Sequence, residues 1–326
     1  MGDVVAILDC NFPNTATEEG IVTASGRRLL KGTCRTEADV IAFAEDAAGI
    51  IVQYAPLTSR VIGNLRRCQV ITRYGIGVDN IDVAAASAAG IWVTNVPGFC
   101  AAELAEHSLA MILSLTRKLP RLNASVRAGG WETIANMRPT RQLSKLTLGL
   151  VGFGHVGREV ARLATAFGMT VLATAPRTTS HDMAKHGVTG VSLEDLLARS
   201  DIVSLHLPLA PASHHLLDAR HLAMMKPSAL LINTSRGPIV EESALIDALL
   251  DGRLAGAGLD VLETEPPRRD NPLLAMDNVI VTPHAAYYSD DSLAYLQSAV
   301  AKEVVRVLGG SAPRSPVNPG IVPRVV

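Results

Sequence analysis

The sequence predicts an α/β protein of two domains, each built on a doubly wound parallel sheet. Three observations predict this fold class. The 326 residues exceed the usual size of a single hydrophobic core. Short apolar runs alternate with helical patterns along the chain, as they do in βαβ units. A glycine-rich stretch, LGLVGFGHVG at residues 148–157, joins an apolar run to a helical pattern near the middle of the chain.

The first third of the chain carries four apolar runs that we expect to be strands. They lie at residues 4–8, 49–54, 69–75 and 91–95. Helical patterns at residues 37–45 and 82–89 separate some of these runs. A longer helical stretch at residues 101–119 is apolar on most of its circumference, which predicts a helix buried between layers. The polar stretch 123–145 after it is expected to be irregular.

A second series of runs begins at the glycine-rich stretch. Its later members lie at residues 170–175, 201–208, 229–235, 256–261 and 278–285. Six runs separated by helices predict one doubly wound sheet, and an amphipathic helix at residues 158–168 follows the glycines directly. The chain then returns to a helix at residues 292–308. We therefore expect a central domain, residues 98–286, inserted into a first domain formed by residues 1–97 and 287–326.

Composition and charge argue against several classes of protein. Apolar residues make up 48% of the chain and charged residues 19%, as in a globular protein. The net charge is −1 and no dense run of lysine and arginine occurs, so we expect no nucleic-acid partner. No apolar run reaches the roughly 18 residues of a membrane span, and the N-terminus resembles a strand rather than a signal peptide, so no membrane partner is expected. Four widely spaced cysteines without a CxxC pair predict reduced thiols, no metal and a cytoplasmic location.

The glycine-rich stretch matches the G-x-G-x-x-G fingerprint at Gly152, Gly154 and Gly157. In that fingerprint a strand leads into a helix whose N-terminal N–H groups bind the pyrophosphate of a dinucleotide. The alternative is a tight turn between a strand and a packed helix, without a ligand. The apolar strand before the glycines and the amphipathic helix after them favour the dinucleotide site.

Polar residues follow three of the predicted strands. They are Arg236 in NTSRGPIVEESAL, Asp260 and Glu265 in GLDVLETEPP, and His284 in VTPHAAYYS. Ligands of an open α/β sheet bind at the carboxyl ends of the strands. Together with RYGIGVDNID at residues 73–82, these stretches resemble the D-2-hydroxyacid dehydrogenase family from about residue 49 onward. NVPGFC and HAAYYSDDSL most resemble the branch related to the C-terminal-binding-protein corepressors.

Arg236, Glu265 and His284 suit the reduction of a 2-oxo acid. The planar guanidinium of Arg236 can hold the substrate carboxylate and polarise the ketone. The imidazole of His284 titrates near neutrality and is the natural proton donor to the ketone oxygen as hydride reaches the carbon. Glu265 would hydrogen-bond that imidazole and favour its charged form. Taken singly, each has an ordinary alternative as a surface ion pair or a turn residue; the resemblance assigns these catalytic roles to the set.

The resemblance implies two Rossmann-like domains, with the cofactor domain inserted into a flavodoxin-like substrate (lid) domain. It places Asp260 near the nicotinamide end of the cofactor. The cofactor-binding residues that it implies are Gly152, Gly154, His155, Val156, Gly157, Arg177, Leu207, Pro208, Thr234, Ser235, Asp260, His284 and Ala286. The substrate-binding residues that it implies are Tyr54, Tyr74, Gly75, Ile76, Arg236 and His284.

The acid that should bind the adenosine ribose, roughly 20 residues after the glycines, is absent. Members of the family specific for NAD carry an aspartate where Ala175 stands. Arg177, Thr178 and Thr179 follow it, and a small residue next to a cation and hydroxyl groups suits a 2′-phosphate. We therefore favour NADP over NAD as the cofactor. The alternative is a loop that has changed while the protein still uses NAD.

The resemblance implies an NAD(P)-dependent D-2-hydroxyacid dehydrogenase, similar to phosphoglycerate dehydrogenase, acting on a small-molecule substrate. Two alternatives stay open: a dinucleotide-sensing interaction module of the corepressor type, and oxidation of an unusual donor such as formate or phosphite. The apolar helix at residues 101–119 and the habit of the family predict a homodimer. His206, His214 and His215 have no acidic or cysteine companion at ligand spacing, so we expect loop residues rather than a metal site.

Overall fold

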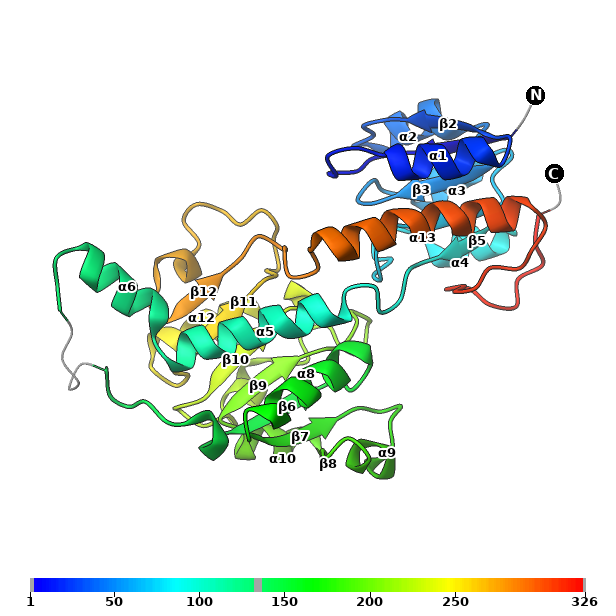
Figure 1. Ribbon diagram of the computed structural model, residues 1–326. Coiled ribbons are helices and arrows are strands. Elements are labelled where there is room, and N and C mark those ends of the chain that lie inside the picture. Colours follow the sequence, from blue (N-terminus) through cyan, green and yellow to red (C-terminus); the bar gives the residue numbers. More distant parts are fainter. Residues whose placement is uncertain (1–2, 132–136, 325–326) are drawn as a thin grey trace. The chain divides into compact units, whose positions relative to one another are not determined.

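The computed structural model describes residues 3–131 and 137–324. The chain forms two compact units, one of Met1–Phe99 with Ser289–Val326 and one of Cys100–Tyr288 (Figure 1). The boundaries expected from the sequence lie two residues earlier at each crossing. Each unit is a parallel sheet with helices on both faces, which confirms the predicted fold class.

The first unit contains a five-stranded sheet in the order β2-β1-β3-β4-β5, with every neighbouring pair parallel. This is the strand order of flavodoxin-like folds. Its strands are β1 Val4–Ile7, β2 Arg28–Lys31, β3 Gly49–Val52, β4 Val70–Arg73 and β5 Trp92–Thr94. All four residues of the central strand β3 are buried, as expected for a strand covered by helices on both faces.

Two sets of helices cover this sheet and enclose two apolar cores. One face packs against α1 Ala16–Ala24 and α13 Asp290–Leu308. The other packs against α2 Glu37–Ala44, α3 Ser59–Asn64 and α4 Val83–Ala88. The C-terminal helix α13 therefore completes the N-terminal unit. Ser289 caps α13, and its first turn carries Asp290 and Asp291, which complement the helix dipole.

Strand β2 and helices α1 and α3 have no counterpart among the elements expected from the sequence. Strand β2, sequence RLLK, lies at the edge of the sheet with exposed ends and two half-buried leucines. An edge strand contacts the core on few positions, so it carries no continuous apolar run. Helix α3 has only six residues, too few to show a helical period.

The second unit contains a seven-stranded parallel sheet in the order β12-β11-β10-β9-β6-β7-β8. Counted from β6, the first six strands follow the Rossmann order, and β12 extends it by one. Its strands are β6 Thr147–Val151, β7 Thr170–Thr174, β8 Thr189–Gly190, β9 Ile202–Leu205, β10 Leu230–Asn233, β11 Gly256–Leu259 and β12 Val279–Val281. The six expected runs all became strands, and β8, a two-residue edge strand, was not predicted.

Helices cover both faces of this sheet as well. The helices on one face include α5 Ala101–Thr116, α8 His155–Ala166 and α9 Ser180–Ala184. Those on the other face are α10 Leu193–Arg199, α11 Ala219–Leu222 and α12 Glu242–Leu250. The short 3-10 turns are η1 Leu143–Lys145, η2 Gly237–Ile239 and η3 Pro272–Ala275.

The stretch around α5 departs from its prediction in two ways. The helix is not buried all round, because Ala102, Glu106 and Ala110 form an exposed stripe at a spacing of one turn. It also ends early, since Lys118 adopts a left-handed conformation before a second helix, α6 Leu119–Arg127. No residue of α6 is buried, and Figure 1 shows it standing off the body of the unit. Part of the stretch expected to be irregular is thus helical, and its residues 132–136 lie outside the described residues.

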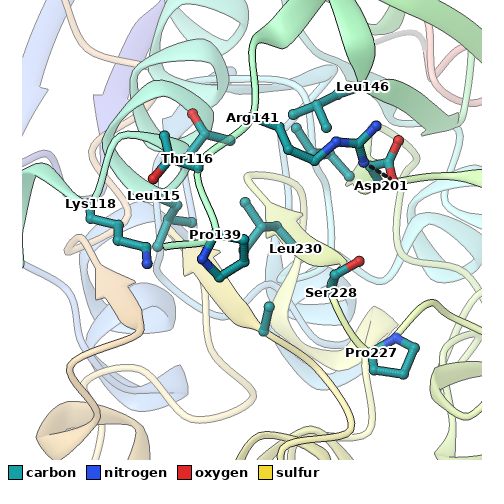
Figure 2. Close-up of a pocket in the computed structure, with 13 residues that line it drawn as sticks. Leu115, Thr116, Lys118, Pro139, Arg141, Leu146, Asp201, Pro227, Ser228 and Leu230 are labelled. Atoms are coloured by element: carbon teal, nitrogen blue, oxygen red, sulfur yellow. Dashed lines mark hydrogen bonds and ion pairs between the residues drawn. The ribbon is translucent and has the colours of Figure 1, made fainter. Parts of the chain in front are cut away.

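A cavity of about 510 Å³ lies at the amino ends of the strands, the edge opposite to their carboxyl ends (Figure 2). It is lined by the end of α5, by the segment at Pro139 and by residues that precede β6, β9, β10 and β11. At its wall, the Asp201 carboxylate pairs with Arg141 and with Lys226, each at 3.0 Å, and accepts the N–H of Thr147 at 2.9 Å. These contacts tie the segment that follows α6 to the start of β9.

Asp201→Asn is expected to lower the free energy of unfolding by about 1–3 kcal/mol at pH 7, because the carboxylate is largely buried while its two cations are partly exposed. Burial alone would raise the pKa of Asp201, but the N–H of Thr147, Lys226 and Arg141 together hold its pKa below the ordinary value. A lowered folded-state pKa stabilises the protein above the unfolded aspartate value of about 3.9, and this contribution is lost as the pH falls through the folded-state pKa. Urea denaturation of both chains at pH 7 and pH 3 measures it. A difference between them that does not shrink from pH 7 to pH 3 would contradict the ion-pair origin.

Candidate active site

The glycine loop after β6 has the shape that a pyrophosphate needs. Gly152 has φ +102°, and a Cβ there would meet the carbonyl oxygen of His206, so only glycine fits this turn. A Cβ on Gly157 would lie 2.5 Å from the carbonyl oxygen of Gly152, so the helix packs tightly on the strand. Gly154, the N-cap of α8, has no neighbour within 4 Å of its Cβ position. The loop thus leaves open space in front of the N–H groups of a twelve-residue helix, which fits a dinucleotide.

The loop after β7 carries the cation expected to face the ribose end of the cofactor. Arg177 is exposed, and among the described residues no side chain pairs with its guanidinium. Ala175 is partly buried against the core beside α8. The Thr179 hydroxyl is already hydrogen-bonded within the protein. It caps α9 by accepting the N–H of Asp182, and it donates to the Asp182 carboxylate at 2.8 Å. Of the two hydroxyl groups expected to assist a 2′-phosphate, that of Thr179 is therefore held by the protein itself.

Arg236 follows β10 and begins the short turn η2. The side-chain amide of Asn233 donates to the Arg236 carbonyl at 2.9 Å, which holds the backbone at this strand end. The Arg236 side chain donates to the carbonyl of Ser235 at 2.7 Å. A Cβ on Gly237 would meet the carbonyl of Leu262, so the Arg236 turn packs directly on the loop that leads to Glu265. The positive charge of Arg236 acts to lower the pKa of the Glu265 carboxyl.

His284 and Glu265 form a hydrogen-bonded pair. Nδ1 of His284 lies 2.7 Å from Oε2 of Glu265, and both side chains are a little over one-third exposed. The other Glu265 oxygen accepts the N–H of Leu262 at 3.1 Å. Burial by itself would raise the pKa of Glu265, but the hydrogen bond and charge of His284, the Leu262 N–H and the charge of Arg236 bring its pKa below the usual value. The carboxylate is thus ionised at neutral pH, and it orients the imidazole with Nε2 left for a reacting atom.

Asp260 shapes the turn that carries His284. Its buried carboxylate accepts the N–H groups of Ala285 and Ala286, each at 2.9 Å, and its backbone carbonyl accepts the N–H of His284 at 2.9 Å. Thr282 donates its hydroxyl to the same carboxylate at 2.5 Å. His284 has φ +53°, which is costly for a residue with a side chain, so these bonds must stabilise the turn. Asp260 is 2% exposed, and its carboxylate contacts the turn of His284 rather than open space.

The other residues expected to bind the cofactor also lie at carboxyl ends of strands. Leu207 and Pro208 follow β9, and Thr234 and Ser235 follow β10. The Ser235 hydroxyl donates to the Leu205 carbonyl at 2.6 Å and so ties these two strand ends together. The structure brings them to one edge with the glycine loop because all strands of a parallel sheet run in the same direction.

The residues expected to bind the substrate through the first unit are Tyr54, Tyr74, Gly75 and Ile76, and the structure describes them only within that unit. Tyr54 is 54% exposed. Tyr74 is 2% exposed, and its hydroxyl donates to the buried Glu18 carboxylate at 2.6 Å, so its side chain belongs to the core. Gly75 has φ +133°, and a Cβ there would meet the Arg73 side chain. Residue 74 can therefore contact a substrate only through its backbone.

Three further histidines near this edge have partners in space that the sequence did not reveal. His206 Nε2 lies 2.8 Å from the Ser204 hydroxyl, and burial lowers the pKa of His206 to about 3, so its ring stays neutral. His214 stacks on His215 with ring centroids 4.0 Å apart. His215 pairs with Glu263 at 2.6 Å, an acidic companion 48 residues away in the chain. No cluster of three or more potential metal ligands occurs among residues 3–131 and 137–324.

Comparison with known proteins agrees with this geometry. Residues 109–286 match the D-isomer specific 2-hydroxyacid dehydrogenase, NAD binding domain. The chain is 35% identical over 291 residues to a D-3-phosphoglycerate dehydrogenase of Methanocaldococcus jannaschii, with 89% of this chain and 55% of that protein covered. It is 37% identical over 269 residues to a glyoxylate reductase of Korarchaeum cryptofilum, with 82% of this chain and 81% of that protein covered.

A crystal structure of D-lactate dehydrogenase from Aquifex aeolicus, complexed with NAD and lactic acid, is 31% identical and superposes with a TM-score of 0.86. The match covers 94% of this chain and 96% of that one. The chain spans only about half the length of several curated D-3-phosphoglycerate dehydrogenases that it matches, between 52% and 59%. The matched domain and the nucleotide-bound relative show that the second unit is a nicotinamide dinucleotide-binding domain, and the chain belongs to the D-isomer specific 2-hydroxyacid dehydrogenase family.

Proposed function

We propose that the protein transfers a hydride between a nicotinamide dinucleotide and a small 2-oxo acid, giving the D-2-hydroxy acid. The observation that carries this proposal is the His284–Glu265 pair at 2.7 Å, held on the carboxyl edge of the dinucleotide-binding sheet. The bound dinucleotide supplies the hydride. The chain supplies the proton, since Glu265 favours the imidazolium of His284, and Nε2 can donate to the ketone oxygen.

The substrate carboxylate and ketone require a cationic partner, which we assign to Arg236. Its turn is fixed by Asn233 and packs on the loop of Glu265, so the guanidinium and the imidazole are carried by neighbouring segments. The planar guanidinium suits two oxygens on adjacent carbons. We assign contacts with the substrate carboxylate to Tyr54 and to the backbone of Tyr74, Gly75 and Ile76 in the first unit.

A panel of 2-oxo acids tests this function. Glyoxylate, pyruvate, hydroxypyruvate and 3-phosphohydroxypyruvate are each offered with NADPH and with NADH, and cofactor oxidation is followed by absorbance. Turnover of at least one member supports the proposal and names the substrate class. A chain that binds the dinucleotide and reduces none of them would instead favour the corepressor-like interaction module. That alternative is disfavoured because the compared relatives are named dehydrogenases and reductases.

We propose NADP as the preferred cofactor. Two features support this preference. Arg177 is exposed and can pair with a 2′-phosphate, and position 175 carries no acid that would repel it. The half-buried Thr178 is the remaining hydroxyl of the loop, since the hydroxyl of Thr179 is engaged by Asp182. The recognition site would therefore depend mainly on one cation.

We also propose a homodimer and a cytoplasmic location. The four free cysteines suit a reducing compartment. Among residues 3–131 and 137–324, no helix combines the length and apolar character needed to cross a membrane. Helix α6 has no buried residue, while Leu119 and Val126 are each 52% exposed and Trp131 is 87% exposed. Such side chains on a segment that stands off the body are suited to a second copy of the chain.

Light scattering at micromolar concentration is expected to give the mass of two chains. Val126→Glu together with Trp131→Glu places charges in this apolar surface and is expected to shift the mass to that of one chain. Glu194→Gln, a change at an exposed position of α10, serves as the control and should leave the mass unchanged. A wild-type monomer would contradict the proposal, and an unchanged dimer in the double variant would place the interface elsewhere.

A further inference from the structure

We infer that His107 is a positioning residue that fixes the turn of His284 from helix α5, through Thr282 and Asp260. The inference rests on the proposed function, since it concerns the same proton donor. His107 lies in the middle of α5 and belongs to none of the segments that form the candidate site. Its imidazole is the first member of a chain of hydrogen bonds that ends at the backbone N–H groups of Ala285 and Ala286.

The order of donors along this chain follows from the groups themselves. The Asp260 carboxylate accepts two N–H groups and the Thr282 hydroxyl, at 2.9, 2.9 and 2.5 Å. A threonine has a single hydroxyl hydrogen, so once it donates to Asp260 its oxygen must accept from the neighbour on its other side. That neighbour is Nε2 of His107 at 3.0 Å, which therefore carries a hydrogen. Nε2 of His107 also lies 3.8 Å from the Asp260 carboxylate, close enough for the negative charge of that carboxylate to attract the Nε2–H group.

The turn needs such support because His284 is left-handed at φ +53°. The N–H groups of Ala285 and Ala286 keep their hydrogen bonds only while the Asp260 carboxylate keeps its orientation. Thr282 fixes one oxygen of that carboxylate, and His107 fixes Thr282 against a helix packed on β11 and β12. The side chain of Asp260 is 1% exposed, so water has little access to replace the bonds to its carboxylate. Loss of His107 should thus loosen the turn without touching the substrate or the cofactor.

Hydrogen–deuterium exchange of the Ala285 and Ala286 amides tests the inference without any need for activity. His107→Leu is expected to speed their exchange about three- to tenfold, the worth of one hydrogen bond between uncharged groups. Thr282→Val, which keeps the side-chain shape, should do the same. His107→Gln retains an N–H donor and should restore slow exchange. His221→Leu is the matched control, since it removes an imidazole bonded to Asp218 at 2.7 Å in helix α11 and should leave residues 284–286 unchanged.

Kinetics separate positioning from general damage. In His107→Leu and Thr282→Val, kcat for the 2-oxo acid should fall about three- to tenfold while KM stays within about twofold, because the loss concerns the proton donor and not binding. The double variant should lose no more than the worse single variant, since both changes break one chain. Unchanged amide exchange in both single variants, or losses that multiply in the double variant, would overturn the inference. If the wild type reduces no 2-oxo acid, the proposed function fails and the exchange experiment still decides the role of His107.

Discussion

His284→Ala is expected to lower kcat for 2-oxo acid reduction by about 100-fold or more, the usual contribution of a positioned acid–base group. The side chain is the proton donor in the proposed reaction, and no other imidazole is paired with Glu265 in the described structure. KM should change far less, because the substrate contact that we propose for Arg236 is left intact. His215→Ala is the matched control, since it removes another histidine paired with a glutamate, Glu263 at 2.6 Å, and should change kcat by less than about twofold. Wild-type turnover in His284→Ala would remove His284 from the mechanism.

Glu265→Gln is the companion variant. The ionised Glu265 favours the imidazolium of His284, and a neutral amide does not. Reduction needs the proton, so the pH optimum of reduction should move downward. Steady-state rates from pH 5 to pH 9 measure the shift. An optimum that stays in place or moves upward would show that Glu265 does not promote protonation of His284.

Substitutions in the loop after β7 are expected to change the preference between NADPH and NADH, which is the second large effect. If Arg177 faces the 2′-phosphate, Arg177→Ala should weaken NADPH binding about ten- to a hundredfold and leave NADH nearly untouched, the range for one charge-assisted pair. Ala175→Asp should reverse the preference, because it adds an acceptor for the ribose hydroxyls and a charge that repels the phosphate. Nucleotide fluorescence titrations give the dissociation constants. Arg199→Ala, an exposed arginine at the end of α10, controls for the loss of positive charge.

The salt dependence of the same constants provides an independent check. Arg177 is exposed, so its interaction with a phosphate is screened by ions, and NADPH binding should weaken more than NADH binding as salt is raised. NADH that binds as tightly as NADPH to the wild type would contradict the preference. It would mean that Arg177 faces solvent and that another contact replaces the missing acid.

The sequence alone predicts the architecture, because strands buried on both faces read as continuous apolar runs. All residues of β3, β9, β10 and β11 are buried, and each lies in a predicted run. It also determined that Arg236, Glu265 and His284 lie at one edge, since the carboxyl ends of parallel strands meet there. The edge strands β2 and β8 were missed, because an edge strand is too short or too exposed to leave such a run.

The folded structure alone shows which groups each polar side chain contacts. It placed the Tyr74 side chain in the core on Glu18, committed the Thr179 hydroxyl to Asp182, and paired His215 with Glu263. It turned Asp260 toward the backbone of the His284 turn and brought His107 to Thr282, which is 175 residues away in the chain. Periodicity and turn residues report on neighbours within a few positions. A hydrogen bond between residues so far apart in the chain forms only when two packed layers bring the donor and the acceptor together. No local sequence pattern therefore predicts it.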